Sequence, residues 1–217
     1  MRFLIAAVFM IFGIVSTTNT SEAQTRLWSS ADTGNSQFGA NFGGRAGADT
    51  FCQANIPANV SAFAATAGVR TIAFLSIDAT DEIRDLPLTA NVPTNETIFR
   101  ADGTTQIATN FAALLDTTTT PLNNSIAFSA VNATPMTGSF GDGSVDTANT
   151  CSGFASGSNS DQAAIGAAGD VGPTYLRRTA SLSTLPCDFL FSSLYCITFM
   201  PAAATAATPA SATGLEW

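Results

Sequence analysis

The stretch GANFGGRAGADTFCQ, residues 39–53, joins a glycine-rich turn to the start of an amphipathic helix. After Gly47, apolar residues recur at the spacing of one helix face. They are Ala48, Phe51, Cys52 and Ile56. Asp49 lies near the expected first turn, where a carboxylate suits the helix dipole. Pro57 is expected to end the helix.

The glycines of this stretch also come close to the phosphate-loop pattern G-x-x-x-x-G-K-[ST]. Arg45 stands where that pattern has lysine, and Ala46 stands where it has serine or threonine. Residues 27–38 look like a loop, whereas a phosphate loop follows a buried strand. We therefore expect no nucleotide site. We interpret four glycines as residues that give the backbone the conformational freedom to turn into the helix. They are Gly39, Gly43, Gly44 and Gly47.

The N-terminus predicts the compartment and the domain boundaries. A positive Met1-Arg2 start, an apolar run over residues 3–15 and small residues before Gln24 are typical of a secretory signal peptide. We predict a signal peptide over 1–23, cleaved after Ala23, a single domain over 24–200, and a flexible Ala/Thr/Pro tail over 201–217. The protein is then secreted or displayed at the cell surface.

The charge inventory excludes several kinds of chemistry. The chain has no histidine, a formal net charge of −8 and a pI of about 4.2. Ser-His-Asp and Cys-His catalysis and histidine metal ligands are therefore ruled out. An acidic chain also disfavours nucleic acid and anionic membranes as partners. The adjacent pair Arg177-Arg178 is interpreted as a solvated loop.

The cysteines predict two disulfides. An even number of cysteines in an exported chain indicates paired thiols. They are Cys52, Cys151, Cys187 and Cys196. Spacing alone leaves all three connectivities open. No C-x-x-C spacing occurs, so a zinc site is not expected.

Hydrophobic patterns place the remaining elements. We expect strands at 71–77, 125–131 and 194–200, a short helix at 78–87 closed by Pro87, and a hairpin over 97–109 around Asp102-Gly103. Three segments lack periodicity and are predicted as loops or irregular structure: 24–45, 116–124 and 132–186. Helices early and strands later indicate an α+β fold.

Several motifs carry a resemblance to a known family. GGRAGADTFCQ followed by TIAFLSIDATDEIRDL resembles the start of the endostatin domain of certain collagens. TIFRADGTT, IAFSAVNATP, CSGFASG and CDFLFSSLYCITF follow in the order of that family's later strands and cysteines. The same signature resembles a bacterial family of exported domains without an assigned function, common in surface proteins. The resemblance covers about residues 38–200.

The resemblance implies a C-type-lectin-like fold. Such a fold has mixed and antiparallel strands, two short helices, a long irregular loop region and two nested disulfides. The implied pairing is Cys52–Cys196 outside and Cys151–Cys187 inside. The outer bond would tie the first helix to the last strand.

The leading functional hypothesis is a non-catalytic binding or structural module without a cofactor. It would recognise an extracellular protein or glycan. Domains of the resembled fold carry specificity on their loops, which directs attention to residues 132–186. Arg45, Arg70 and Arg84 are the arginines that folding could gather on one surface.

Two alternatives remain. A calcium-dependent lectin would use Asp142 and Asp146 of GDGSVD, although the segment lacks the dense acids of a calcium loop and favours an ordinary turn. A glycan hydrolase would need two carboxylates from the densest acidic cluster. That cluster consists of Asp78, Asp81, Glu82 and Asp85. We interpret it as a solvated helix face and cap, and expect no enzyme.

Overall fold

The computed structural model describes residues 24–34, 39–128, 132–179, 182–190 and 192–202. The predicted signal peptide and the predicted tail beyond Ala202 lie outside these residues. Within the described ranges, no helix is long and apolar enough to cross a membrane.

The described chain is a mixed α+β structure, which confirms the predicted class. Its strands are β1 (Thr25–Ser29), β2 (Arg70–Ala73), β3 (Ile98–Phe99), β4 (Gln106–Ala108), β5 (Pro135–Met136), β6 (Gln162–Ala164), β7 (Thr184–Pro186) and β8 (Ser193–Phe199). Its helices are α1 (Arg45–Ala54), α2 (Ala58–Ala64), α3 (Leu86–Thr89), α4 (Phe111–Leu115) and α5 (Cys151–Phe154). The C-type-lectin-like assignment stays a prediction.

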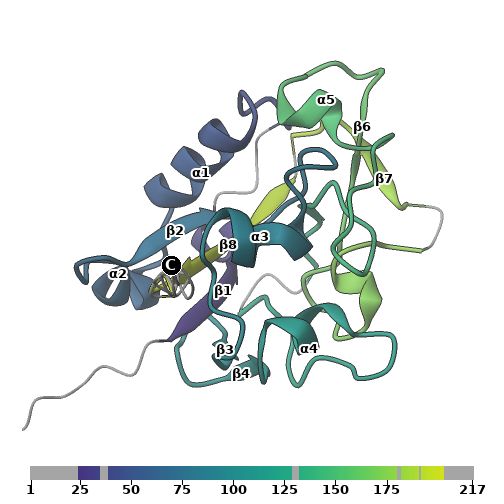
Figure 1. Ribbon diagram of the computed structural model, residues 1–217. Coiled ribbons are helices and arrows are strands. Elements are labelled where there is room, and N and C mark those ends of the chain that lie inside the picture. The colour runs from purple at the N-terminus through teal and green to yellow at the C-terminus, as the bar shows by residue number, and fades with distance from the viewer. Residues whose placement is uncertain (1–23, 35–38, 129–131, 180–181, 191, 203–217) are drawn as a thin grey trace, which may run out of the picture.

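The main sheet has the strand order β2-β8-β1-β3-β4, with β5 also paired to β8. β8 is antiparallel to both β1 and β2, whereas β1 is parallel to β3. Strands from the two ends of the described chain therefore lie side by side in the middle of the sheet (Figure 1). A smaller sheet pairs β6 with β7.

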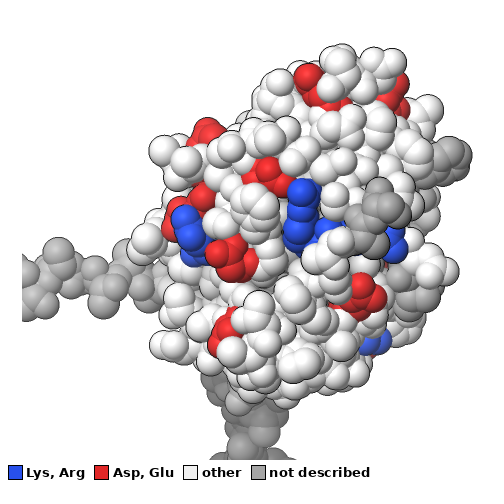
Figure 2. Space-filling model, turned by 90° about the vertical axis from the view of Figure 1, so that its right-hand side faces the viewer, with Lys and Arg blue, Asp and Glu red and all other residues white. Residues whose placement is uncertain are grey.

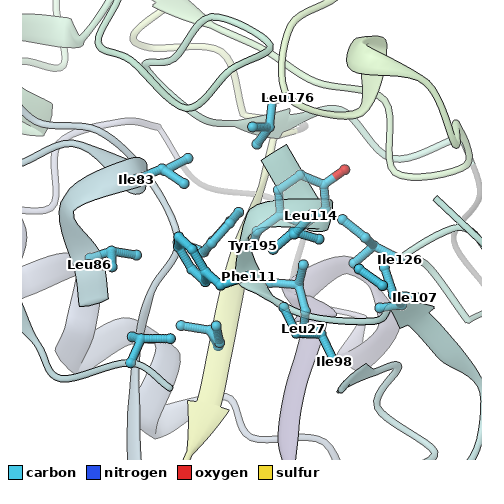
Figure 3. Packing of buried hydrophobic residues seen from close by; sticks show 14 of the residues in the cluster. Leu27, Ile83, Leu86, Ile98, Ile107, Phe111, Leu114, Ile126, Leu176 and Tyr195 are labelled. Carbon is cyan, nitrogen blue, oxygen red and sulfur yellow. The ribbon is translucent and has the colours of Figure 1, made fainter. Parts of the chain in front are cut away.

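Both faces of the main sheet are covered, because alternate residues of its strands enter two hydrophobic clusters. Leu27 and Tyr195 belong to the first cluster, which α3, α4 and long loops cover. Figure 3 shows these side chains converging with Phe111 and Leu114 of α4. Trp28 enters the second cluster, which lies beneath α1 and α2. Double coverage explains why every residue of β8 is buried.

The helix predicted from the opening stretch is confirmed as α1. Its buried residues are Ala48 and Cys52, as the spacing indicated. A Cβ atom at Gly47 would overlap the carbonyl oxygen of Phe42, so only glycine fits there. The helix begins at Arg45, two residues before the predicted start. A second helix, α2, follows it and was not predicted.

The prediction of loop structure over residues 24–45 was wrong, because β1 is a central strand. All of β1 except Arg26 is buried, and this includes the polar residues Thr25 and Ser29. The Thr25 hydroxyl donates to Glu96 Oε2 at 3.1 Å, and the Ser29 hydroxyl accepts from the N–H of Ala31. Because these buried residues are polar, β1 does not show the alternation of apolar and polar residues by which a half-buried strand is recognised in a sequence.

Two other predictions need correction. The segment 78–87 is not one helix: a short 3-10 turn begins at Ile83, and Pro87 lies at the start of α3 rather than after a helix. Proline suits that position because it lacks the N–H that a first turn leaves unpaired. Residues 125–128 form no strand, although Ile126 is buried in the core. Residues 129–131 of that predicted strand lie outside the described part.

Several other predictions are confirmed. The hairpin around Asp102-Gly103 is formed by β3 and β4. The final strand is β8, and the strand predicted at 71–77 is present as the shorter β2. Residues 132–186 are largely irregular, with only short strands and turns among those described. Residues 110–115, for which no element was predicted, contain α4.

The nested disulfide pairing implied by the resemblance is confirmed. Cys52–Cys196 fastens α1 to β8, and Cys151–Cys187 closes the irregular region. All four cysteines are buried. The outer bond therefore holds the first helix against the last strand.

The inner disulfide begins at an unusual backbone turn. Every residue of α5 has a positive φ, from 51° at Cys151 to 71° at Gly153, so this turn is left-handed. The last residue of α5 accepts two main-chain hydrogen bonds. The N–H groups of Phe42 and Gly44 both donate to the carbonyl oxygen of Phe154. Two of the N–H groups that a phosphate loop would direct at a nucleotide are here used within the protein.

Candidate functional site

The open edge of β2 is covered by polar side chains of α1. β2 is an outermost strand of the main sheet. The N–H of Phe74 donates to Tyr195 on β8, so the main-chain groups of Thr71, Ala73 and Leu75 face away from the sheet. Uncovered, such groups would form an edge that can pair with another chain.

Arg45 makes the densest set of these contacts. It donates to the carbonyl oxygens of Ala73 and Leu75, each at 2.7 Å. Its Nε and a terminal nitrogen also donate to the two carboxylate oxygens of Asp81, at 2.8 and 2.6 Å. The forked geometry of guanidinium suits such paired acceptors. The hydrogen-bonding capacity of Arg45 is therefore used in holding α1, β2 and the following loop together.

Asp49 and Gln53 extend the same stripe at helical spacing. Asp49 Oδ1 accepts from the N–H of Ala73 at 2.8 Å and lies 4.0 Å from Arg45. The Gln53 side chain donates to the carbonyl oxygen of Thr71 at 3.2 Å. The interpretation of Asp49 as a first-turn dipole partner was wrong, because it faces β2 from further along α1.

Arg70 lies on the same edge but is bound far less. It is exposed at the start of β2, and it donates to the carbonyl oxygen of Ala90 at 2.9 Å. Its guanidinium also lies 6.0 Å from the ring centre of Phe199. A guanidinium has five N–H donors. Among the described residues, no further hydrogen bond engages Arg70, so most of its donors remain available.

Two adjoining cavities follow this edge and meet at Asp49, Arg70 and Ile72. The first, of about 330 Å³, is bounded by α1, α2 and β2. The second, of about 190 Å³, is bounded by α1, β2 and α3. We call the pair the edge cleft. Its lining is mixed, because charged and polar side chains lie beside aliphatic ones in both cavities.

Burial changes the acidity of the carboxylate in this cleft. Desolvation raises the pKa of Asp49 above its ordinary value, against the opposing effects of the Ala73 N–H and of the positive charges of Arg45 and Arg70. A carboxyl group with a raised pKa in a cleft marks a candidate functional residue. Asp49 therefore belongs to the candidate site as well as to the edge contacts.

Three carboxylates of the acidic cluster that a hydrolase would need are engaged in hydrogen bonds within the protein. Asp81 is paired with Arg45, and Glu82 is buried with its two oxygens accepting from Arg84 and from the N–H of Val145. Asp78 accepts from the hydroxyl and N–H of Thr80, which lowers the pKa of Asp78.

The two residues proposed for calcium are not brought together as ligands. Asp142 accepts from the hydroxyl and N–H of Ser144, and these bonds lower the pKa of Asp142. Asp146 is buried and forms an ion pair with Arg177 at 2.8 Å. In the described ranges, no group of three or more acidic or cysteine side chains could hold a metal ion.

Folding brings together two of the three arginines that were expected to share one surface. Arg45 and Arg70 line the edge cleft, whereas Arg84 is paired with Glu82 outside it. Arg177 was interpreted as part of a solvated loop. It is instead mostly buried against Asp146, with its guanidinium 5.8 Å from the ring centre of Phe140.

Asp49 and Gln53 were not identified from the sequence as site residues. The available signal was the spacing of Arg45, Asp49 and Gln53, which places three polar side chains on one stripe of α1. A polar stripe is usually a solvated face, so the spacing alone does not show that it covers a strand edge.

Comparison with known proteins places the chain in a family. No curated protein matches it significantly. Residues 35–171, more than half of the chain, match the family DUF1554, described as a protein of unknown function. That match covers α1, β2 and α3, and with them most of the edge cleft. The chain therefore belongs to the DUF1554 family.

Proposed function

We propose that the chain is a non-catalytic binding module of an exported protein, and that the edge cleft takes a small ligand. One observation carries this proposal. Arg70 and Asp49 lie at the junction of the two cavities with opposite charges and unused hydrogen-bonding capacity. The neighbouring charges of Arg45 and Asp81 already satisfy each other.

The engagement of the other carboxylates supports a non-catalytic role. A hydrolase needs one carboxyl group free to donate a proton and a second free to act as nucleophile or base. Asp81 and Glu82 each have both oxygens bound within the protein. The sequence also lacks the histidine that most alternative acid–base arrangements use.

The disulfides support export. Two buried disulfides are typical of proteins that fold in an oxidising compartment. The signal peptide predicted over residues 1–23 would deliver the chain there.

The surface charge supports a ligand other than nucleic acid. On the face in Figure 2, which carries much of the irregular region, most of the surface is uncharged and blue and red atoms largely intermingle. A phosphate backbone binds to clustered basic residues, and the net charge of −8 would oppose it.

Fragment screening tests the proposal. The full chain, labelled with ¹⁵N, would be screened by NMR against small polar fragments, in parallel with Arg70→Ala and with Arg178→Ala as a control outside the cleft. We expect binders to shift the amide signals of Asp49, Gln53 and Thr71, and Arg70→Ala to abolish those shifts. If all binders map to other surfaces, the edge cleft is not the binding site.

A further inference from the structure

We propose that the edge cleft recognises an apolar amino-acid unit, either free or at the C-terminus of a short peptide. Its carboxylate would bind Arg70, its amine or amide N–H would bind Asp49, and its side chain would lie against the aliphatic residues of one lobe. This inference rests on the proposed binding function and names the ligand class for that site.

The charged groups of the cleft that are incompletely paired within the protein indicate a ligand that carries both a hydrogen-bond donor and a hydrogen-bond acceptor. Arg45 and Asp81 neutralise each other through two hydrogen bonds. Arg70, with one hydrogen bond, and Asp49, which lies 4.0 Å from Arg45, are less completely paired and have opposite charges. A simple anion bound to Arg70 would be repelled by Asp49, and a simple cation bound to Asp49 would be repelled by Arg70. A zwitterion or a peptide unit satisfies both.

The unused hydrogen-bonding atoms match the same unit. Arg70 keeps donors beyond the one bonded to Ala90, and a carboxylate accepts two of them side by side. Asp49 uses Oδ1 for the Ala73 N–H, and in the described part of the chain Oδ2 accepts no hydrogen bond. Gln53 donates through its amide nitrogen, so its side-chain oxygen can accept a ligand N–H.

Part of each lobe is lined by aliphatic side chains, which lie beside the charged and polar groups of the cleft. The larger lobe, of about 330 Å³, is lined by Ile56, Ala64 and Val69 beside the shared floor residue Ile72. The smaller lobe, of about 190 Å³, adds Leu86. One lobe can take an aliphatic side chain while the other accommodates a preceding residue of a peptide. Burial of such a side chain would add affinity that neither charge provides.

Calorimetric titration of the full chain with matched probes tests the inference. The probes are leucine, leucyl-leucine, 4-methylpentanoate (leucine without its amine) and 3-methylbutylamine (leucine without its carboxylate). We expect leucine or leucyl-leucine to bind about ten- to a hundredfold more tightly than either half-probe, the effect of one charged hydrogen-bonding partner. Preference for leucine indicates a free amino acid, and preference for leucyl-leucine indicates a peptide end.

Variants of Arg70 and Asp49 test which residue binds each end of the ligand. Arg70→Ala should weaken leucine to the level of 3-methylbutylamine, and Asp49→Asn should weaken it to the level of 4-methylpentanoate. Arg70→Lys keeps the positive charge but loses the paired N–H donors of the guanidinium group. Its affinity for leucine should lie between those of the wild type and Arg70→Ala. Arg178→Ala and Asp188→Asn should leave binding unchanged, and thermal melting would verify that each variant is folded.

Three results would overturn the inference. They are a half-probe that binds as tightly as leucine, no binding of any of the four probes, and equal losses in the two control variants. If fragments shift Asp49 and Thr71 in the NMR screen while these probes fail, the proposed function survives and only this ligand class is wrong.

Discussion

Arg45 and Arg70 line the same cleft, on facing elements, yet they differ in what they can still bind. Arg45 donates to two main-chain carbonyl oxygens and to both oxygens of Asp81. Arg70 is exposed, and within the described part of the chain it donates to a single carbonyl oxygen. The first arginine stabilises the sheet edge, and the second has donors left for a ligand.

The difference shows that charge alone does not identify a binding residue. Both residues are arginines and carry the same formal charge. Counting donors and acceptors separates them, because a group whose bonds are satisfied within the protein must break them before it can bind a ligand. By the same count, both oxygens of Asp81 are occupied, whereas Asp49 keeps one oxygen that accepts no hydrogen bond from the described residues.

The largest expected effect comes from the bond that holds α1 in place. Replacing Cys52 and Cys196 together by alanine should lower the free energy of unfolding by about 3–5 kcal/mol, since the bond closes a long loop. Urea denaturation measures this loss. Replacing Cys151 and Cys187, which are only 36 residues apart, provides a control with a smaller entropic effect. A larger loss in that control would contradict this reasoning.

Arg45→Ala tests the structural arginine. We expect a loss of about 2–4 kcal/mol in unfolding free energy, because Asp81 and two carbonyl oxygens lose their partner in a mostly buried position. Urea denaturation beside Arg178→Ala measures it. A loss below about 1 kcal/mol would mean that water replaces these bonds, as it does at exposed ion pairs.

Asp49→Asn should change the unfolding free energy by about 1 kcal/mol or less at neutral pH, because the amide accepts the Ala73 N–H less strongly than a carboxylate does but no longer buries a charge. Its pH dependence has a definite sign. Burial raises the pKa of Asp49 above the ordinary 3.8, so between 3.8 and that raised value the folded chain binds more protons than the unfolded chain. In this window the stability contributed by Asp49 increases as pH falls.

The measurable result is a difference between the two proteins. As pH falls from neutral to about 4, the wild type should gain stability relative to Asp49→Asn. Carboxyl groups with lowered pKa values, such as Asp78 and Asp142, are present in both proteins and cancel. A difference that stays constant with pH, or that changes in the opposite direction, would contradict the raised pKa.

The smallest expected effect on stability is that of Arg70→Ala. It removes one hydrogen bond at an exposed position and a weak contact with Phe199, so we expect a loss below about 1 kcal/mol. Thermal melting measures it. A loss as large as that of Arg45→Ala would make Arg70 a structural residue and remove the contrast on which the binding proposal depends.

Parts of the fold were predictable because they leave a pattern in the apolar residues. Cys52 lies on a regular helical face, and β8 is a largely apolar run, so both were found. β1 was missed because its polar residues are buried with internal partners. The segment around Ile126 was mistaken for a strand because its apolar residues pack in the core without sheet pairing.

The sequence by itself determined the absence of histidine chemistry, the even number of cysteines and the position of the first helix. Only the tertiary structure decided that Arg45 is satisfied and that Arg70 is available. The physical reason is that the partners of both arginines include main-chain carbonyl oxygens, those of Ala73, Leu75 and Ala90. Every residue carries such a group, so no sequence pattern reveals which of them a distant side chain will bind.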